Sequence, residues 1–148
     1  IRHVEGLVLT NPNKRIALVP FGYSPQILTF MAGCALPQLH QGHTLSRMTM
    51  EQIVSSVSEM VDWDRSLPVC ECAAMVTKAI ATLRTEHATA LGPALCAALG
   101  LAQSYPRSTE ITLCTAGEPT TGVGSDRSTM STFYSEVGDL AVQLGTRI

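Results

Sequence analysis

The strongest constraint on the fold is a run of apolar residues that is too short for a helix of ordinary length. This run, Arg-Ile-Ala-Leu-Val-Pro-Phe at 15–21, lies between an Asn-Pro-Asn turn at 11–13 and Gly22. A short, continuous apolar run between turn residues is typical of a β-strand buried on both faces. A second run at 26–31 predicts a neighbouring strand, joined to the first as a hairpin across residues 22–25.

Amphipathic segments predict the helices. The clearest spans 68–84 and begins at Pro68, which suits a first helical turn. Its apolar residues follow the i, i+3, i+4 spacing of one helix face, and they are Cys72, Met75, Val76, Ala79, Ile80 and Leu83. Further helices are predicted at 51–60 with Thr49 or Ser46 as N-cap, at 93–103, and after Ser128 or Thr129, and residues 1–9 form the end of another.

The remaining segments complete an α/β pattern. Residues 34–47 are predicted as a loop and 110–115 as a third strand. Alternating strands and helices favour a Rossmann-like, mostly parallel sheet with helices on both faces. A length of 148 residues is typical of a single domain.

Composition narrows the possible partners. Ten Lys and Arg against twelve Asp and Glu leave no basic stripe for phosphates, so nucleic-acid binding is not expected. No apolar run approaches the roughly 18 residues of a membrane span. Charged residues make up 15%, below the usual value of about 25%, which suggests that much of the surface is covered by something else. Five irregularly spaced cysteines favour buried thiols in a reducing compartment, which implies an intracellular, cytoplasmic location.

Three segments in order resemble a von Willebrand factor A domain. Residues 13–21 resemble the second strand of that family, and Thr-Ala-Leu-Gly-Pro-Ala-Leu at 89–95 is similar to the start of its third helix. Ile-Thr-Leu-Cys-Thr-Ala-Gly-Glu-Pro-Thr at 111–120 resembles the end of its fourth strand, Thr-Asp-Gly-Glu-Pro-Thr. The resemblance implies that residues 1–148 are one such domain, a segment of a longer chain that lacks the central first strand of the sheet.

The same resemblance implies a degenerate metal site. Family members commonly bind a divalent cation through an Asp-x-Ser-x-Ser motif, one Thr and one Asp. The chain contains no Asp-x-Ser-x-Ser, and Ala116 stands where the second Asp belongs. Thr89 matches the family's Thr, but one hydroxyl cannot hold a hard cation such as Mg²⁺ without carboxylates. We therefore expect no cofactor.

Other candidate sites carry weaker signals. The two thiols of Cys70-Glu71-Cys72 point about 200° apart on a helix, so they cannot share a zinc ion with His87. His40 and His43 are expected to be solvated loop residues. Cys114 has no base beside it in sequence and is expected to be a buried structural thiol. The Gly-rich stretch 117–125 lacks the Gly-Lys-Ser/Thr of a phosphate-binding loop and is predicted to be a surface loop.

The sequence thus predicts a non-enzymatic protein–protein interaction module that serves as a scaffold in a larger intracellular assembly. The partner-binding face is expected at the carboxyl edge of the sheet, near residues 21–25. Its candidate residues are Thr89, Gly117, Glu118, Thr120, Asp126 and Arg127. One alternative is a Mg²⁺-dependent adhesion-type recognition domain, with Thr89 on the metal and carboxylates from an upstream strand. The other is a Rossmann-like enzyme that acts on a small molecule.

Overall fold

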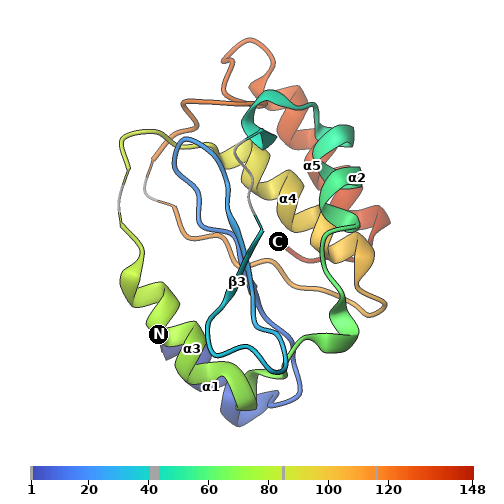
Figure 1. Ribbon diagram of the computed structural model, residues 1–148. Helices are drawn as coiled ribbons and strands as arrows, with labels where there is room; N and C mark the ends of the chain where they lie inside the picture. The colour runs from blue at the N-terminus through green and yellow to red at the C-terminus, as the bar shows by residue number, and fades with distance from the viewer. Residues whose placement is uncertain (1, 41–43, 85, 116) are drawn as a thin grey trace.

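A computed structural model describes residues 2–40, 44–84, 86–115 and 117–148 of the chain (Figure 1). Its strands are short and come early in the chain, and longer helices follow. In chain order the elements are α1 (Arg2–Thr10), β1 (Ala17–Leu18), β2 (Ile27–Thr29), β3 (Gln38–His40), η1 (Leu45–Arg47), α2 (Met50–Ser58), η2 (Trp63–Arg65), α3 (Val69–Thr82), α4 (Leu91–Ser104) and α5 (Met130–Gln143). None of the helices in these ranges is long and apolar enough to cross a membrane.

The sheet confirms the predicted hairpin but not the predicted strand direction. β1 pairs with β2 and β2 with β3, both antiparallel, with Ala17 opposite Thr29 and Ile27 opposite His40. The turn between β1 and β2 is closed by the amide of Gln26, which donates to the Pro20 carbonyl over 2.8 Å. Connections this short can only join antiparallel strands, whereas parallel strands need a long crossover. A mixed helix-and-sheet fold is therefore present, and the mostly parallel Rossmann-like sheet is replaced by an antiparallel one.

Residues 110–115 do not form the predicted third strand. Glu110 makes an isolated parallel bridge with Arg147, and the amide of Ile111 donates to the Arg147 carbonyl over 2.7 Å. The pairing stops there, and Leu113 is 40% exposed. The segment predicted as a loop at 34–47 instead contains β3 and η1.

The helix predictions are confirmed to within a few residues. Thr49 caps α2 through a capping box, because its hydroxyl accepts from the amide of Gln52 while its own amide donates to the Gln52 side chain. α3 begins directly after Pro68. After α5 the chain turns at Gly145, whose φ of 63° lies in the left-handed region that favours glycine.

The sheet separates two apolar clusters, one on each face. Figure 1 shows α1 and α3 together on one side and α2, α4 and α5 on the other. Alternate residues of the hairpin enter different clusters: Ile27 packs with the helices α2, α4 and α5, while Phe30 packs with α1 and α3. Both side chains are fully buried. The prediction of helices on both faces is therefore confirmed.

Candidate partner-binding loop face

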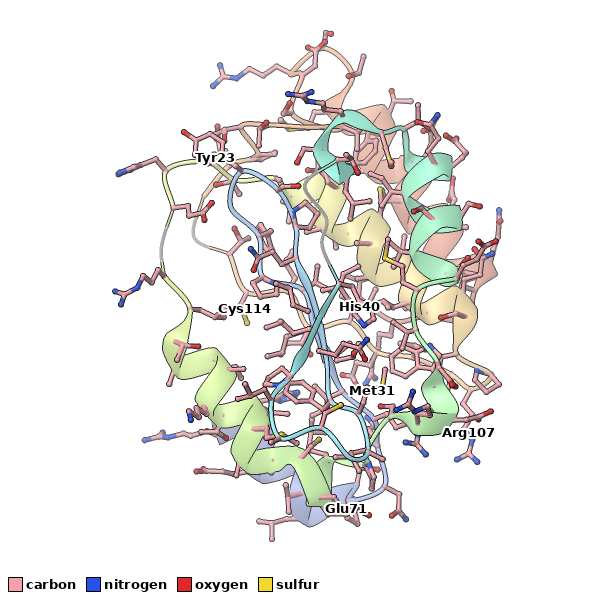
Figure 2. All side chains as sticks on the ribbon, in the orientation of Figure 1. Tyr23, Met31, His40, Glu71, Arg107 and Cys114 are labelled. Atoms are coloured by element: carbon pink, nitrogen blue, oxygen red, sulfur yellow. The ribbon has the colours of Figure 1, made fainter. Side chains whose placement is uncertain are left out.

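Three connecting segments meet at the N-terminal end of α4. The amide of Ala90 donates to the Gly22 carbonyl over 2.8 Å, and the amide of Tyr23 donates to the Glu86 carboxylate over 2.9 Å. The hydroxyl of Ser46 donates to the Tyr23 carbonyl over 2.7 Å. Figure 2 shows Tyr23 at this end of the molecule. We call residues 21–25, 86–90 and 117–128 together the loop face.

Thr89 and Thr120 form the centre of the loop face. The amide of Thr89 donates to the Thr120 hydroxyl over 2.8 Å, and the amide of Thr120 donates to the Thr89 carbonyl over 3.0 Å. Gly117 lies so close that a Cβ there would be 3.3 Å from the Thr89 hydroxyl oxygen. Three of the candidate residues are thus in direct contact or close to it.

Glycines let the loop at 121–125 lie directly over the start of α4. A Cβ on Gly92 would collide with the Val123 carbonyl, so a side chain at this position would displace the loop. Gly122 and Gly124 have φ of 78° and 76°, which other residues rarely adopt. The start of α4 is therefore covered by protein and is not an open anion site.

The charged candidates lie at the exposed rim of the loop face. Arg127 and Glu118 form an ion pair over 3.7 Å, with their side chains 89% and 84% exposed. Asp126 accepts hydrogen bonds from the amide and the hydroxyl of Ser128 over 2.9 and 2.8 Å. Those two bonds lower the pKa of Asp126. An exposed ion pair contributes little stability. Arg127 and Glu118 can therefore separate and pair with charged groups of a partner at little cost in free energy.

The structure therefore brings the six candidate residues to one end of the molecule. Glu86 and Ser46 are further contributors that the sequence did not single out. Each holds the turn at Tyr23 through a hydrogen bond to its backbone. No local pattern signals such contacts between distant segments.

The described residues do not form a metal site. They contain no group of three or more His, Cys, Asp and Glu side chains placed to hold an ion. Thr89, the expected ligand of the Mg²⁺ alternative, bonds to Thr120 through its backbone amide and carbonyl, and Ala116, where the family's Asp would stand, lies outside the described residues. His43 also lies outside them, whereas His40 is half-buried and shares a 3.0 Å hydrogen bond with the Thr29 hydroxyl. Desolvation lowers the pKa of His40.

All five cysteines are free thiols. Cys72 and Cys96 are buried, while Cys34, Cys70 and Cys114 are exposed. Cys70 and Cys72 point into different environments, as their spacing on α3 predicts. Cys114 is not the buried structural thiol that we expected, because the segment that carries it is not a strand in the sheet.

Comparisons with known proteins do not support the resemblance to a von Willebrand A domain. No model of a known protein family matches it. A protein of Dictyostelium discoideum described as circularly permutated Ras protein 1 is 29% identical over 150 residues. That alignment covers 98% of this chain but 17% of the relative, so the chain spans about a sixth of the length of the relative.

This similarity overturns the von Willebrand A interpretation. The relative is described as a Ras protein and not as a von Willebrand A protein. The expectation of a von Willebrand A-like, non-enzymatic scaffold was therefore wrong, both as a family assignment and as a function. The motif at 111–120 misled because the family's version ends a central strand, whereas here 111–115 is not a strand.

Proposed function

We propose that this chain acts in GTP-dependent signalling, as a segment related to a Ras-type protein. The observation that carries the proposal is the similarity to the Ras relative, which runs through 98% of the chain. Ras-type proteins change their contacts with other proteins according to the bound nucleotide. An intracellular location is part of this proposal, because exposed free thiols such as Cys34 and Cys70 are typical of reducing compartments.

The described residues do not fit the phosphates of GTP or its Mg²⁺. The sequence has no Gly-x-x-x-x-Gly-Lys-Ser/Thr, and its two lysines, Lys14 and Lys78, lie outside the loop face. The Gly-rich loop that covers α4 is held against Gly92 and carries no lysine. A Mg²⁺ ion accompanies the nucleotide in Ras proteins, but no cluster of acidic or His side chains in the described ranges suits it. We therefore derive no step of phosphate binding or hydrolysis from these residues.

The part of the signalling function that the geometry supports best is contact with a protein partner through the loop face. Loops held on a rigid scaffold commonly carry binding residues. Thr89, Thr120 and the glycines fix the loop at 117–128, and the exposed Glu118 and Arg127 supply charge of both signs at its rim. The partner is then recognised by polar and charged groups rather than by an apolar patch.

Site-specific cross-linking tests both parts of the proposal. A photoreactive amino acid replaces Glu118 on the loop face or, as a control, Glu71 on α3 at the opposite end of the molecule (Figure 2). Each variant is illuminated in cell extract with GTPγS or with GDP. We expect adducts from position 118 that differ in amount between the two nucleotides, and no such difference from position 71. Adducts from position 118 that ignore the nucleotide contradict the signalling role, and an absence of adducts there contradicts the partner face.

Saturable binding of a fluorescent GTP analogue is measured on the same chain, with an ATP analogue as control. Saturable GTP binding by the 148 residues alone would mean that they form a nucleotide site that the contacts given above do not account for.

A further inference from the structure

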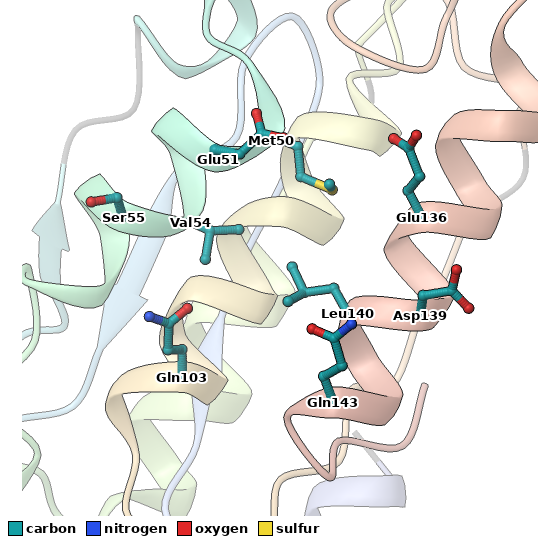
Figure 3. Close-up of a pocket in the computed structure, with 9 residues that line it drawn as sticks. All are labelled: Met50, Glu51, Val54, Ser55, Gln103, Glu136, Asp139, Leu140 and Gln143. Carbon is teal, nitrogen blue, oxygen red and sulfur yellow. The ribbon is translucent and has the colours of Figure 1, made fainter.

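A groove lies between α2 and α5, with α4 beneath it. Its volume is about 500 Å³ and it is open to solvent. Figure 3 shows Val54 of α2 and Leu140 of α5 on the two sides of the gap. Met50 adds a third apolar side chain at one end. The groove is separate from the loop face, because none of its lining residues belongs to residues 21–25, 86–90 or 117–128.

Half of the polar residues that line the groove are acidic, and the others are the neutral Ser55, Gln103 and Gln143. Glu51 on α2 and Glu136 and Asp139 on α5 contribute carboxylates. The helices α2, α4 and α5 carry no Lys, Arg or His, so no basic side chain of these helices neutralises the carboxylates. The three ion pairs found in the described ranges all use other acidic side chains. Apolar side chains on the walls of the groove and carboxylates that form none of the ion pairs in the described ranges are complementary to a basic amphipathic segment.

We propose that this groove binds a basic amphipathic helix of a protein partner. Leu-type side chains of the helix would pack on the partly exposed Met50 and Leu140, and Lys or Arg side chains at its edges would approach Glu136 and Asp139. An amphipathic helix presents these two kinds of side chain at i, i+3 and i+4 positions, which is how such helices dock in apolar grooves. Charge of opposite sign also speeds the encounter of the two proteins at low salt.

The binding test uses a synthetic helix of Leu and Lys residues labelled with a fluorophore, and a matched helix with Glu in place of Lys. We expect the Lys peptide to raise the fluorescence anisotropy in a saturable way and the Glu peptide not to. Glu136→Gln with Asp139→Asn should weaken binding about tenfold, since each lost charge pair contributes a modest amount. Leu140→Ser should weaken it as well, with circular dichroism showing that this variant is folded.

The control removes the same net charge elsewhere, by Glu5→Gln on α1 with Glu71→Gln on α3. Binding by this control should stay within twofold of the unaltered chain. Equal weakening by both double variants would overturn the proposal, since attraction would then be non-specific. Analytical ultracentrifugation provides a second test. If the unaltered chain is a dimer and Glu136→Gln with Asp139→Asn dissociates it, the groove is occupied by a second copy of the chain, which would also overturn the proposal.

Discussion

Thr89 and Thr120 hold each other by two hydrogen bonds of 2.8 and 3.0 Å, although 31 positions separate them in the chain. One bond uses the Thr120 hydroxyl and the other uses backbone groups alone. The pair joins the segment that leads into α4 to the loop that covers the start of that helix. One of the two bonds between these segments therefore depends on a single side-chain oxygen.

Thr120→Val tests this dependence, because valine keeps the shape of threonine and removes the hydroxyl. The amide of Thr89 then loses its acceptor, and the free energy of unfolding should fall by about 1 kcal/mol. Urea unfolding followed by circular dichroism measures the change. Thr112→Val, at an exposed position outside the loop face, serves as the control and should change stability by less than about 0.5 kcal/mol. If the two variants are equally stable, the hydroxyl of Thr120 does not hold the loop.

Replacing either of two helical glycines by alanine should change the stability of the fold, in opposite directions at the two positions. At Gly100 in α4 a Cβ would lie 2.8 Å from the Val54 carbonyl oxygen and 2.9 Å from the Val57 Cβ. Gly100→Ala should therefore destabilise the fold by about 1–3 kcal/mol through overpacking. At Gly138 in α5 nothing lies within 4 Å of the added carbon, so Gly138→Ala should stabilise by about 0.5–1 kcal/mol. Thermal melts of both variants measure the difference, and equal melting shifts would mean that α2 does not lie against α4 at Gly100.

The cysteines should divide into two reactivity classes. Burial raises the pKa of the Cys96 thiol to about 12 and also raises the pKa of Cys72. Because the thiolate is the reactive form, neither should react with Ellman's reagent at pH 8 in the folded protein. Cys34, Cys70 and Cys114 are exposed and should react. Titration in buffer and then in denaturant counts both classes, and five fast thiols in buffer would contradict the buried positions of Cys72 and Cys96.

Because of Glu110, part of the free energy of unfolding should depend on pH in the acid range. It forms ion pairs with Arg147 over 2.9 Å and Lys14 over 3.4 Å, and these hydrogen bonds lower the pKa of Glu110. A lowered carboxyl pKa contributes stability above the unfolded value, about 4.3, and this contribution disappears as the pH falls through the folded value.

The variant Glu110→Gln should accordingly have a flatter dependence of melting temperature on pH below about 4.5 than the unaltered chain. Glu71→Gln, on the exposed face of α3, is the control. An unchanged profile in Glu110→Gln would show that the ion pairs do not persist in solution.

Local pattern was sufficient to predict the helices and the hairpin. The apolar stripe of 68–84 marks the buried side of α3, since Cys72 and Val76 are fully buried. Thr49 caps α2 because its hydroxyl and the Gln52 side chain satisfy amides within one turn. These signals lie within a few residues of the element that they define, so a single sequence contains them.

Long-range pairing was not predictable in the same way. The segment at 110–115 has the apolar content of a strand, yet a strand also needs a neighbour along its length, and here pairing is limited to the bridge of Glu110 with Arg147. The six candidate residues of the loop face were found through a resemblance that proved wrong. They nevertheless lie together, because the bonds between Thr89 and Thr120, the ion pair of Glu118 with Arg127 and the glycines at 122 and 124 hold the loop beside the start of α4.

The close approach at Gly100 also determines which helix can adjust when the groove is filled. The backbone of α2 rests against α4 where a side chain is missing, so these two helices have no room to move closer to each other. A ligand of a different thickness must then be accommodated by displacement of α5. A thicker or thinner bound helix would displace α5, and a fluorescent probe at the exposed Val142 would detect this displacement.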